Sequence, residues 1–217
     1  MRRRGLRAWR ALAGGTVVAL AGAVAACAPA ETSAQPGQGG AGAARDTATF
    51  ASGCFWCTES DFEQVPGVVD AVSGYTGGRV ANPTYEQVSS GGTGHREAVQ
   101  VIYDPARVSY ARLLDVYWRN VDPVDATGQF CDKGEQYTSA IYVATPEERQ
   151  LAETSKRAIE QSGRLTKPVV TAIVPVAPFY RAEEYHQAYY KKNPIRYKYY
   201  RTSCGRDRRL AQLWGDR

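Results

Sequence analysis

The chain has 217 residues, 43% of them hydrophobic and 23% charged, which is enough apolar material for a folded domain with a sizeable core. Its formal net charge is +5, but five arginines and no acidic residue fall within residues 1–26, which leaves 22 charges of each sign in the rest. This balance excludes the class of proteins that bind nucleic acid through a basic surface.

The first 26 residues have the pattern of a secretory signal. The arginines lie before position 11, and the uncharged run Ala11–Ala26 of small and apolar residues follows them. That run is too short, and too rich in Ala and Gly, for a transmembrane helix. It ends in Val24-Ala25-Ala26-Cys27, which resembles a lipobox. We therefore expect lipidation of Cys27 and export to the cell envelope or periplasm, with membrane attachment only through this lipid. Removal as an ordinary secretion signal is the alternative.

Residues 27–46 are predicted to be a flexible tether. Between Ala28 and Asp46 there is no aromatic residue and no Leu, Ile, Val or Met, so this segment cannot bury a core. The folded domain is expected over residues 47–217, and no internal repeat is found in it.

The rest of the chain alternates between strand and helix signals. Apolar runs of strand length predict strands at residues 49–52, 68–75, 95–103, 137–144 and 169–176. Helical spacing and start signals predict helices at residues 54–65, 109–120 and 145–161, with Ser109 and Thr145 as N-caps and Pro146 at the first helical position. The order of these elements predicts an α/β (α+β) two-layer sandwich around a split βαβ, ferredoxin-like core. The turn-rich stretches 77–94 and 121–136 are expected to form the site.

Cys54 is the foremost candidate for a reactive group. It follows Gly53 at a strand-to-helix junction, where free backbone N–H groups and the helix dipole stabilise a thiolate. On this reasoning alone the alternatives stay open. Exported cysteines often form structural disulfides, and Cys54 with Cys57 makes the Cys-x-x-Cys pattern of a thioredoxin-like disulfide exchanger. A Cys-His hydrolase could take either His95 or His186 as its base. No metal site is expected, because no zinc-ligand spacing is present.

Five sequence motifs occur in order between Thr49 and Cys204. They are Gly53-Cys54-Phe55-Trp56, Gly74-Tyr75-Thr76-Gly77-Gly78, Asn82-Pro83-Thr84-Tyr85, Gly92-Thr93-Gly94-His95-Arg96-Glu97-Ala98-Val99 and Gln136-Tyr137-Thr138-Ser139-Ala140-Ile141. Together they resemble the A-type peptide-methionine sulfoxide reductase family, whose fold is an α/β sandwich around a split βαβ core. The resemblance implies an oxidoreductase that reduces methionine S-sulfoxide, free or in proteins, and so repairs proteins after oxidative stress.

The same resemblance implies the roles of the site residues. Cys54 is the nucleophile that attacks the sulfoxide sulfur, and Glu97 is the acid that protonates the sulfoxide oxygen. The remaining members line the substrate: Phe55 and Trp56 as an apolar wall for the S-methyl group, Tyr85 and Tyr137 as hydroxyl donors to the oxygen, and Asp132 as part of the polar shell. An acid with a raised pKa near apolar rings can supply this proton at neutral pH.

Recycling requires further thiols. Attack leaves a sulfenic acid on Cys54, which a second thiol converts to a disulfide and an external dithiol then reduces. The chain departs from many family members at Cys57, where glycine is common, and in a tail that lacks their glycine-rich segment. Cys204, Cys57 and Cys131 are all candidates for the resolving thiol, with Cys204 first because a tail can swing to the site, and Cys57 next.

The resemblance also implies what the protein works with. No cofactor is bound, and the reductant is thioredoxin or an envelope equivalent. The partners are proteins and peptides that contain methionine sulfoxide, and we expect a monomer.

Overall fold

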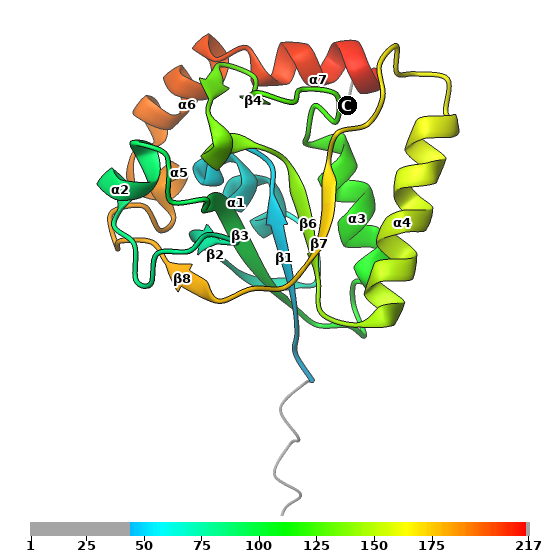
Figure 1. The fold of residues 1–217 in the computed structure, drawn as a ribbon, viewed down its shortest axis with the longest axis horizontal. Helices are drawn as coiled ribbons and strands as arrows, with labels where there is room; N and C mark the ends of the chain where they lie inside the picture. Colours follow the sequence, from blue (N-terminus) through cyan, green and yellow to red (C-terminus); the bar gives the residue numbers. More distant parts are fainter. Residues whose placement is uncertain (1–43, 216–217) are drawn as a thin grey trace, which may run out of the picture. The chain divides into compact units, whose positions relative to one another are not determined.

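The computed structural model describes residues 44–215 (Figure 1). The predicted signal and residues 27–43 of the predicted tether lie outside this range. In chain order the elements are β1 (Asp46–Ala51), α1 (Phe55–Glu63), β2 (Val68–Thr76), α2 (Tyr85–Ser89), β3 (Arg96–Tyr103), α3 (Tyr110–Arg119), β4 (Gly128–Gln129), β5 (Asp132–Lys133), the 3-10 turn η1 (Glu135–Tyr137), β6 (Ala140–Val143), α4 (Pro146–Gln161), β7 (Ala172–Pro175), β8 (Phe179–Arg181), α5 (Tyr189–Lys192), α6 (Pro194–Ser203) and α7 (Arg206–Trp214). Within residues 44–215, no helix combines the length and the apolar character that crossing a bilayer requires.

The main sheet has six strands in the order β7-β6-β1-β3-β2-β8. Strand β3 pairs antiparallel with both β1 and β2, so β1 and β2 run parallel with β3 between them. Helix α1 connects those two parallel strands, and α3 connects β3 to β6 in the same way. This is the predicted split βαβ, ferredoxin-like core. Strand β7 extends the sheet parallel to β6, and β8 extends the other edge antiparallel to β2.

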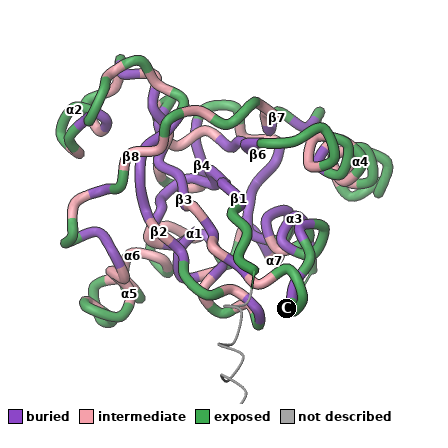
Figure 2. The backbone as a smooth tube through the Cα atoms, turned by 90° about the horizontal axis from the view of Figure 1, so that it is seen from below, coloured by how far each residue is buried: buried purple, intermediate pink, exposed green. Residues whose placement is uncertain are grey.

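The hydrophobic core lies between the sheet and helices α1 and α3. Phe50 of β1 stacks on Phe62 of α1 with ring centroids 4.9 Å apart, and on Tyr117 of α3 at 5.3 Å. Helix α4 packs beside α3, where the Trp118 indole donates a hydrogen bond to Ser155 (Figure 1). Buried positions gather along the central strands, whereas α2 and α4 are largely exposed (Figure 2). The core therefore holds β1, β3 and the start of α1 in fixed positions.

The two predicted N-caps are confirmed. Ser109 accepts a hydrogen bond from the backbone N–H of Arg112, and Thr145 accepts one from Glu148 with Pro146 at the first helical position. These caps satisfy backbone donors that the first helical turn leaves free. Local chemistry was therefore sufficient to locate both helix starts.

The structure differs from the sequence predictions in several elements. Tyr137 ends the 3-10 turn η1 instead of opening a strand, β6 begins only at Ala140, and β7 begins at Ala172. The edge strand β8 and the short helix α2 were not predicted. The tail that was expected to swing to the site is helical and packed in this structure: residues 189–214 form three helices, and Leu210, Leu213 and Trp214 of α7 are buried.

Candidate active site

A cavity of about 70 Å³ lies where β3, the start of α1 and the C-terminal helix α6 meet. All seven residues of the predicted nucleophile, acid and substrate-binding set line it: Cys54, Phe55, Trp56, Tyr85, Glu97, Asp132 and Tyr137. An eighth residue, Tyr200 of α6, completes the lining. Side chains separated by up to 146 positions are therefore brought to one small space.

Cys54 is the N-cap of α1, and Gly53 allows the turn that places it there. Gly53 has φ +86°, and a Cβ at this position would lie 2.6 Å from Cβ of Gln129. The Cys54 carbonyl accepts the first helical hydrogen bonds, from the N–H groups of Cys57 and Thr58 at 3.1 and 3.3 Å. Cys54 is buried, with 6% of its surface exposed. Only glycine fits this left-handed, crowded position without strain.

Burial raises the pKa of the Cys54 thiol, and the nearby Cys57 and Glu97 raise it further. The sequence argument from the helix N-terminus predicted the opposite direction. The difference has a physical cause: removal from water penalises the thiolate more than the first-turn N–H groups stabilise it. The resting nucleophile is therefore a thiol that has to lose its proton.

Glu97 projects from β3 beneath the start of α1 and is 3% exposed. One carboxyl oxygen accepts a hydrogen bond from the backbone N–H of Phe55 at 3.0 Å. Burial raises the pKa of Glu97 to about 8, and the charge of Asp132 acts in the same direction, although the Phe55 N–H opposes it. Glu97 is therefore a neutral acid at pH 7, with a proton available for a buried acceptor.

The apolar wall is formed by the rings of Phe55 and Trp56. Trp56 stacks on Tyr189 with centroids 3.7 Å apart and an interplanar angle of 6°. Its indole N–H donates to Nδ1 of His186 at 3.0 Å, and Tyr200 meets it edge-on at 5.7 Å. A ring held on three sides gives a rigid apolar surface.

Two tyrosine hydroxyls face the carboxyl group across the cavity. Burial raises the pKa of Tyr85 to about 12, and burial together with Glu97 raises that of Tyr137 further. Tyr137 also lies within hydrogen-bond reach of Glu97 and of Tyr85. Both phenols therefore keep their protons near neutral pH and can donate to an oxygen bound between them.

The comparisons with known proteins agree with this geometry. The sequence profile of the family described as peptide methionine sulfoxide reductase matches residues 46–217. The chain belongs to the peptide methionine sulfoxide reductase family. A protein of Bacillus pumilus named peptide methionine sulfoxide reductase MsrA is 51% identical over 173 residues, which cover 80% of this chain and 97% of that protein.

Two solved structures share the fold. Methionine sulfoxide reductase A of Corynebacterium diphtheriae superposes with a TM-score of 0.63 at 34% identity, covering 73% of this chain and 78% of that one. Reduced Mxr1 from Saccharomyces cerevisiae gives a TM-score of 0.65 at 32% identity, covering 70% of this chain and 87% of that one. The family resemblance stated from the five motifs is thus confirmed over the folded region.

The four cysteines of the folded region of this family member form two pairs. Cys131 and Cys204 are joined in a disulfide across 73 sequence positions. Cys54 and Cys57 are free, buried and hydrogen-bonded to each other. That hydrogen bond lowers the pKa of Cys57, and the positive charges of Arg206 and Arg201 lower it too. Among residues 44–215, Cys131, Asp132 and Cys204 are the only group with metal-ligand composition, and its two sulfurs are bonded to each other.

Tyr200 is the lining residue that sequence reasoning missed. Its hydroxyl donates a hydrogen bond to Oδ2 of Asp132 at 2.5 Å, and it is also hydrogen-bonded to the Cys54 thiol. The sequence offers no signal for this position, because Tyr200 lies in a segment with five tyrosines between residues 189 and 200. Only the packing of α6 singles it out.

Neither histidine lines the cavity. His95 accepts from the backbone N–H of Gly78 at 3.1 Å and contacts the carbonyl of Val80 at 2.7 Å, which holds the loop that follows β2. His186 accepts the Trp56 indole N–H. The Cys-His hydrolase alternative therefore has no base facing Cys54.

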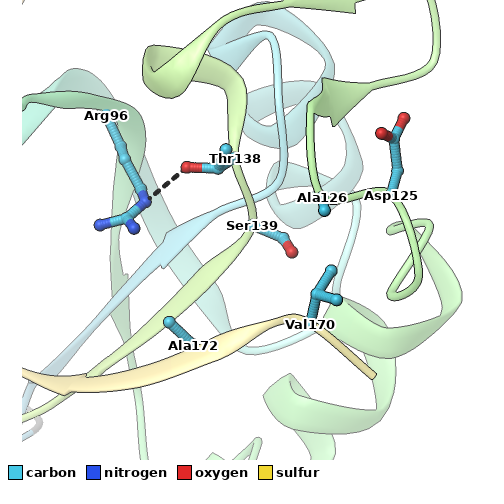
Figure 3. A pocket seen from close by; sticks show the side chains of 7 residues that line it. All are labelled: Arg96, Asp125, Ala126, Thr138, Ser139, Val170 and Ala172. Carbon is cyan, nitrogen blue, oxygen red and sulfur yellow. Dashed lines mark hydrogen bonds between the residues drawn. The ribbon is translucent and has the colours of Figure 1, made fainter. Parts of the chain in front are cut away.

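A wider cavity of about 240 Å³ contains none of the predicted site residues (Figure 3). It lies on the opposite face of β3, because Arg96 and Glu97 are consecutive in that strand and point to opposite faces. The Arg96 guanidinium donates to the Thr138 hydroxyl at 2.8 Å there. Its one acid, Asp125, is paired with Lys133 and Thr127, and the Ser139 hydroxyl is hydrogen-bonded to Thr171.

Proposed function

We propose that the protein reduces methionine S-sulfoxide to methionine by thiol chemistry at Cys54. The cavity carries this proposal: a thiol, a carboxyl group that keeps its proton at pH 7 and an aromatic wall converge on about 70 Å³. A space of that size admits a methylsulfinyl group at the end of a side chain and little more. Family relatives such as the Bacillus pumilus protein are named for this activity.

The chemical step is an oxygen transfer between two sulfur atoms. The Cys54 thiolate attacks the sulfoxide sulfur while Glu97 gives its proton to the oxygen, which forms a bond between the two sulfur atoms. As that bond and the bond from substrate sulfur to oxygen break, the hydroxyl passes to the Cys54 sulfur, leaving methionine and a Cys54 sulfenic acid. The substrate sulfur is reduced by two electrons and the Cys54 sulfur is oxidised by two. A carboxylate at Glu97 could not protonate the oxygen, so its raised pKa is required for the step.

The arrangement of the walls favours one sulfoxide epimer. Phe55 and Trp56 offer the S-methyl group an apolar surface, while the hydroxyls of Tyr85 and Tyr137 face the oxygen with Glu97. Exchanging methyl and oxygen would place a strong hydrogen-bond acceptor against aromatic carbon and leave the buried donors unpaired. An unpaired buried donor costs about 1–3 kcal/mol, so the two epimers are distinguished.

Cys57 is the resolving thiol favoured by geometry. Its sulfur is already hydrogen-bonded to Cys54, and the charges of Arg206 and Arg201 favour its thiolate. Cys204, ranked first from the sequence, is bonded to Cys131 and is held by the helical C-terminal segment. Condensation of the sulfenic acid with Cys57 releases water and forms a Cys54–Cys57 disulfide.

An external dithiol such as a thioredoxin then returns the enzyme to the dithiol state. The alternative function, a thioredoxin-like disulfide exchanger, fits this site poorly. Disulfide exchange needs neither a protonated carboxyl group nor an aromatic wall beside the thiol, and both line this cavity. A methionine sulfoxide side chain needs only the cavity itself.

Export and lipid attachment at Cys27 remain proposals from the sequence. Support comes from the arginine-rich start, the apolar run and the small residues before Cys27. A Cys27→Ala variant should move from the membrane fraction to a soluble or unprocessed form. Recovery of the wild type only in a soluble envelope fraction without N-terminal lipid would contradict the proposal.

The central experiment compares the two epimers of a methionine sulfoxide peptide with dithiothreitol as reductant. Reduction of the S epimer alone is expected, and Cys54→Ser should abolish it because a hydroxyl is a much weaker nucleophile than a thiolate. Insulin reduction without sulfoxide reduction would instead favour the disulfide exchanger. Peptide mapping after one turnover identifies the resolving thiol, and a Cys54–Cys204 bridge would overturn the choice of Cys57.

A further inference from the structure

The site contains a nucleophile that must lose a proton and no obvious group to take it. Burial raises the pKa of Cys54, so the resting group is a thiol. Glu97 is protonated at pH 7 and has to remain so until it protonates the sulfoxide oxygen. The histidines do not line the cavity. The acceptor of the Cys54 proton must therefore be found among the remaining groups.

The groups facing Cys54 come from every element packed around it. Cys57 lies one turn along α1, Glu97 is on β3, and the phenols of Tyr85 and Tyr137 face the cavity from α2 and η1. Asp132 on β5 and Tyr200 on α6 complete the set, and the charge of Lys133 also acts on Asp132. Of these, the candidate acceptors are Asp132, whose pKa is raised by burial, and Cys57, whose pKa is lowered by its hydrogen bond to Cys54 and by nearby arginines.

Tyr200 connects Cys54 to Asp132. Its hydroxyl donates to Oδ2 of Asp132 at 2.5 Å, and the same oxygen is hydrogen-bonded to the Cys54 thiol. A phenol carries one proton, so while that proton is directed at Asp132 the Tyr200 oxygen can accept the Cys54 S–H, in place of its hydrogen bond to Cys57. Once the protons have moved, the phenol donates to the Cys54 thiolate, which is the arrangement that lowers the pKa of Cys54. Thiol, phenol and carboxylate then form one continuous chain of hydrogen bonds.

We propose that Tyr200 and Asp132 form a proton relay that converts Cys54 to its thiolate. The Cys54 proton passes to the Tyr200 oxygen while the phenolic proton passes to Oδ2 of Asp132, which leaves a thiolate, a neutral phenol and a carboxylic acid. No electrons are transferred in this step. This inference rests on the proposed function, because it supplies the nucleophile for the oxygen transfer.

The electrostatics of the two relay residues suit these tasks. Burial and the neighbouring Cys54 and Asp132 strongly raise the pKa of Tyr200, so a free tyrosinate is avoided and the two protons have to move together. Burial raises the pKa of Asp132 above its usual range, although Tyr200 and Arg206 oppose this. A more basic carboxylate is a better match for a thiol proton than an exposed aspartate.

The Cys131–Cys204 disulfide holds both relay residues in place. Asp132 directly follows Cys131, and the Cys204 N–H donates to the Tyr200 carbonyl at 2.9 Å, one turn earlier in α6. The covalent bond therefore joins the two elements that carry Asp132 and Tyr200 next to their hydrogen bond. The contact of Tyr200 with the edge of Trp56 fixes its ring from the other side.

The relay has a measurable consequence for pH dependence. The reactive arrangement and the resting arrangement contain the same number of protons, so the rate should not change with pH between the titration of Asp132 and that of Glu97 near 8. If Cys54 instead lost its proton to solvent, the rate would rise about tenfold per pH unit below the pKa of the thiol. The shape of the profile separates the two mechanisms.

The test measures single-turnover reduction of the S-sulfoxide peptide by the full chain between pH 6 and 7, where Glu97 stays protonated. Two relay variants, Tyr200→Phe and Asp132→Asn, are compared with the wild type and with Tyr199→Phe, a phenol of the same helix that is 76% exposed. Each relay variant should react about 10²-fold more slowly at pH 6.5, because a positioned general base typically raises the rate by about that factor, and its rate should rise with pH. The wild type and Tyr199→Phe should share one rate and one flat profile.

A second readout is alkylation of Cys54 by iodoacetamide, followed by mass spectrometry of its peptide over the same pH range. It needs no sulfoxide, so it tests the relay even if the protein fails to reduce the peptide at any pH, an outcome that would refute the proposed function alone. Flat alkylation in the wild type and rising alkylation in both relay variants support the relay. A wild-type profile that rises tenfold per unit would overturn it. So would a flat profile in Tyr200→Phe combined with a rising one in Cys57→Ser, which would assign the proton to Cys57.

Discussion

The protonation of Glu97 controls the rate of oxygen transfer above neutral pH. With a pKa of about 8, close to nine-tenths of the Glu97 carboxyl groups are protonated at pH 7 and about one-tenth at pH 9. Only the protonated form can give a proton to the sulfoxide oxygen. We therefore expect the single-turnover rate to fall about tenfold between pH 7 and 9. Rapid mixing with the S-sulfoxide peptide and quantification of methionine measure this directly.

Two variants show whether Glu97 is the group responsible. Glu97→Gln should react about 10²-fold more slowly at pH 7 and should lose the decline above pH 8, because glutamine has no titrating proton. Glu59→Gln is a matched control: Glu59 is also a buried carboxyl group, with a pKa raised by burial to about 7, but it does not line the cavity. Its variant should keep the wild-type decline. A wild-type rate that is equal at pH 7 and 9, or a decline that persists in Glu97→Gln, would refute the assignment.

Three further predictions concern stability and are measured by urea unfolding. Replacing both Cys131 and Cys204 by serine should lower the free energy of unfolding by about 4 kcal/mol, because the disulfide closes a loop across 73 positions and so reduces the entropy of the unfolded chain. A loss below about 1 kcal/mol would show that the disulfide contributes little to stability. Arg206→Met removes a buried guanidinium that donates to two backbone carbonyls at 3.1 and 2.6 Å, and it should lower the free energy of unfolding by about 3–5 kcal/mol. The control Arg208→Met, at an exposed arginine, should change it by no more than about 0.5 kcal/mol, and equal effects of the two variants would contradict the prediction. Gly74→Ala places a methyl group 2.3 Å from a ring carbon of β8 and should cost about 1–3 kcal/mol, with faster hydrogen exchange in β8; unchanged exchange would exclude displacement of that strand.

Local signals were sufficient for the central fold. The strands β1, β2 and β3 and the caps Ser109 and Thr145 follow from patterns within a few residues, and their order dictates the split βαβ. The C-terminal helices were missed because their signal is weaker. The spacing of Leu210, Leu213 and Trp214 is that of a buried helix face, but it is surrounded by charged and polar residues, and its burial depends on packing against distant parts of the chain.

The same distinction between local and long-range signals holds for the active site. The five family motifs contain six of the lining residues, and the resemblance adds Asp132, which lies outside them. The hydrogen bond from Tyr200 to Asp132 spans 68 positions and the disulfide spans 73, and no local pattern indicates either contact. The direction of the Cys54 pKa was also missed, since burial of a side chain is a property of the whole fold.

The stacking of Trp56 beside the cavity makes its intrinsic fluorescence sensitive to the state of the active site. An indole parallel to the Tyr189 ring at 3.7 Å, with its N–H directed at His186, emits light in a manner that depends on both neighbours and on whatever occupies the cavity beside it. The other two tryptophans within residues 44–215, Trp118 and Trp214, are buried and do not line the cavity. Changes in fluorescence during turnover therefore report on the Cys54 pocket without any attached dye.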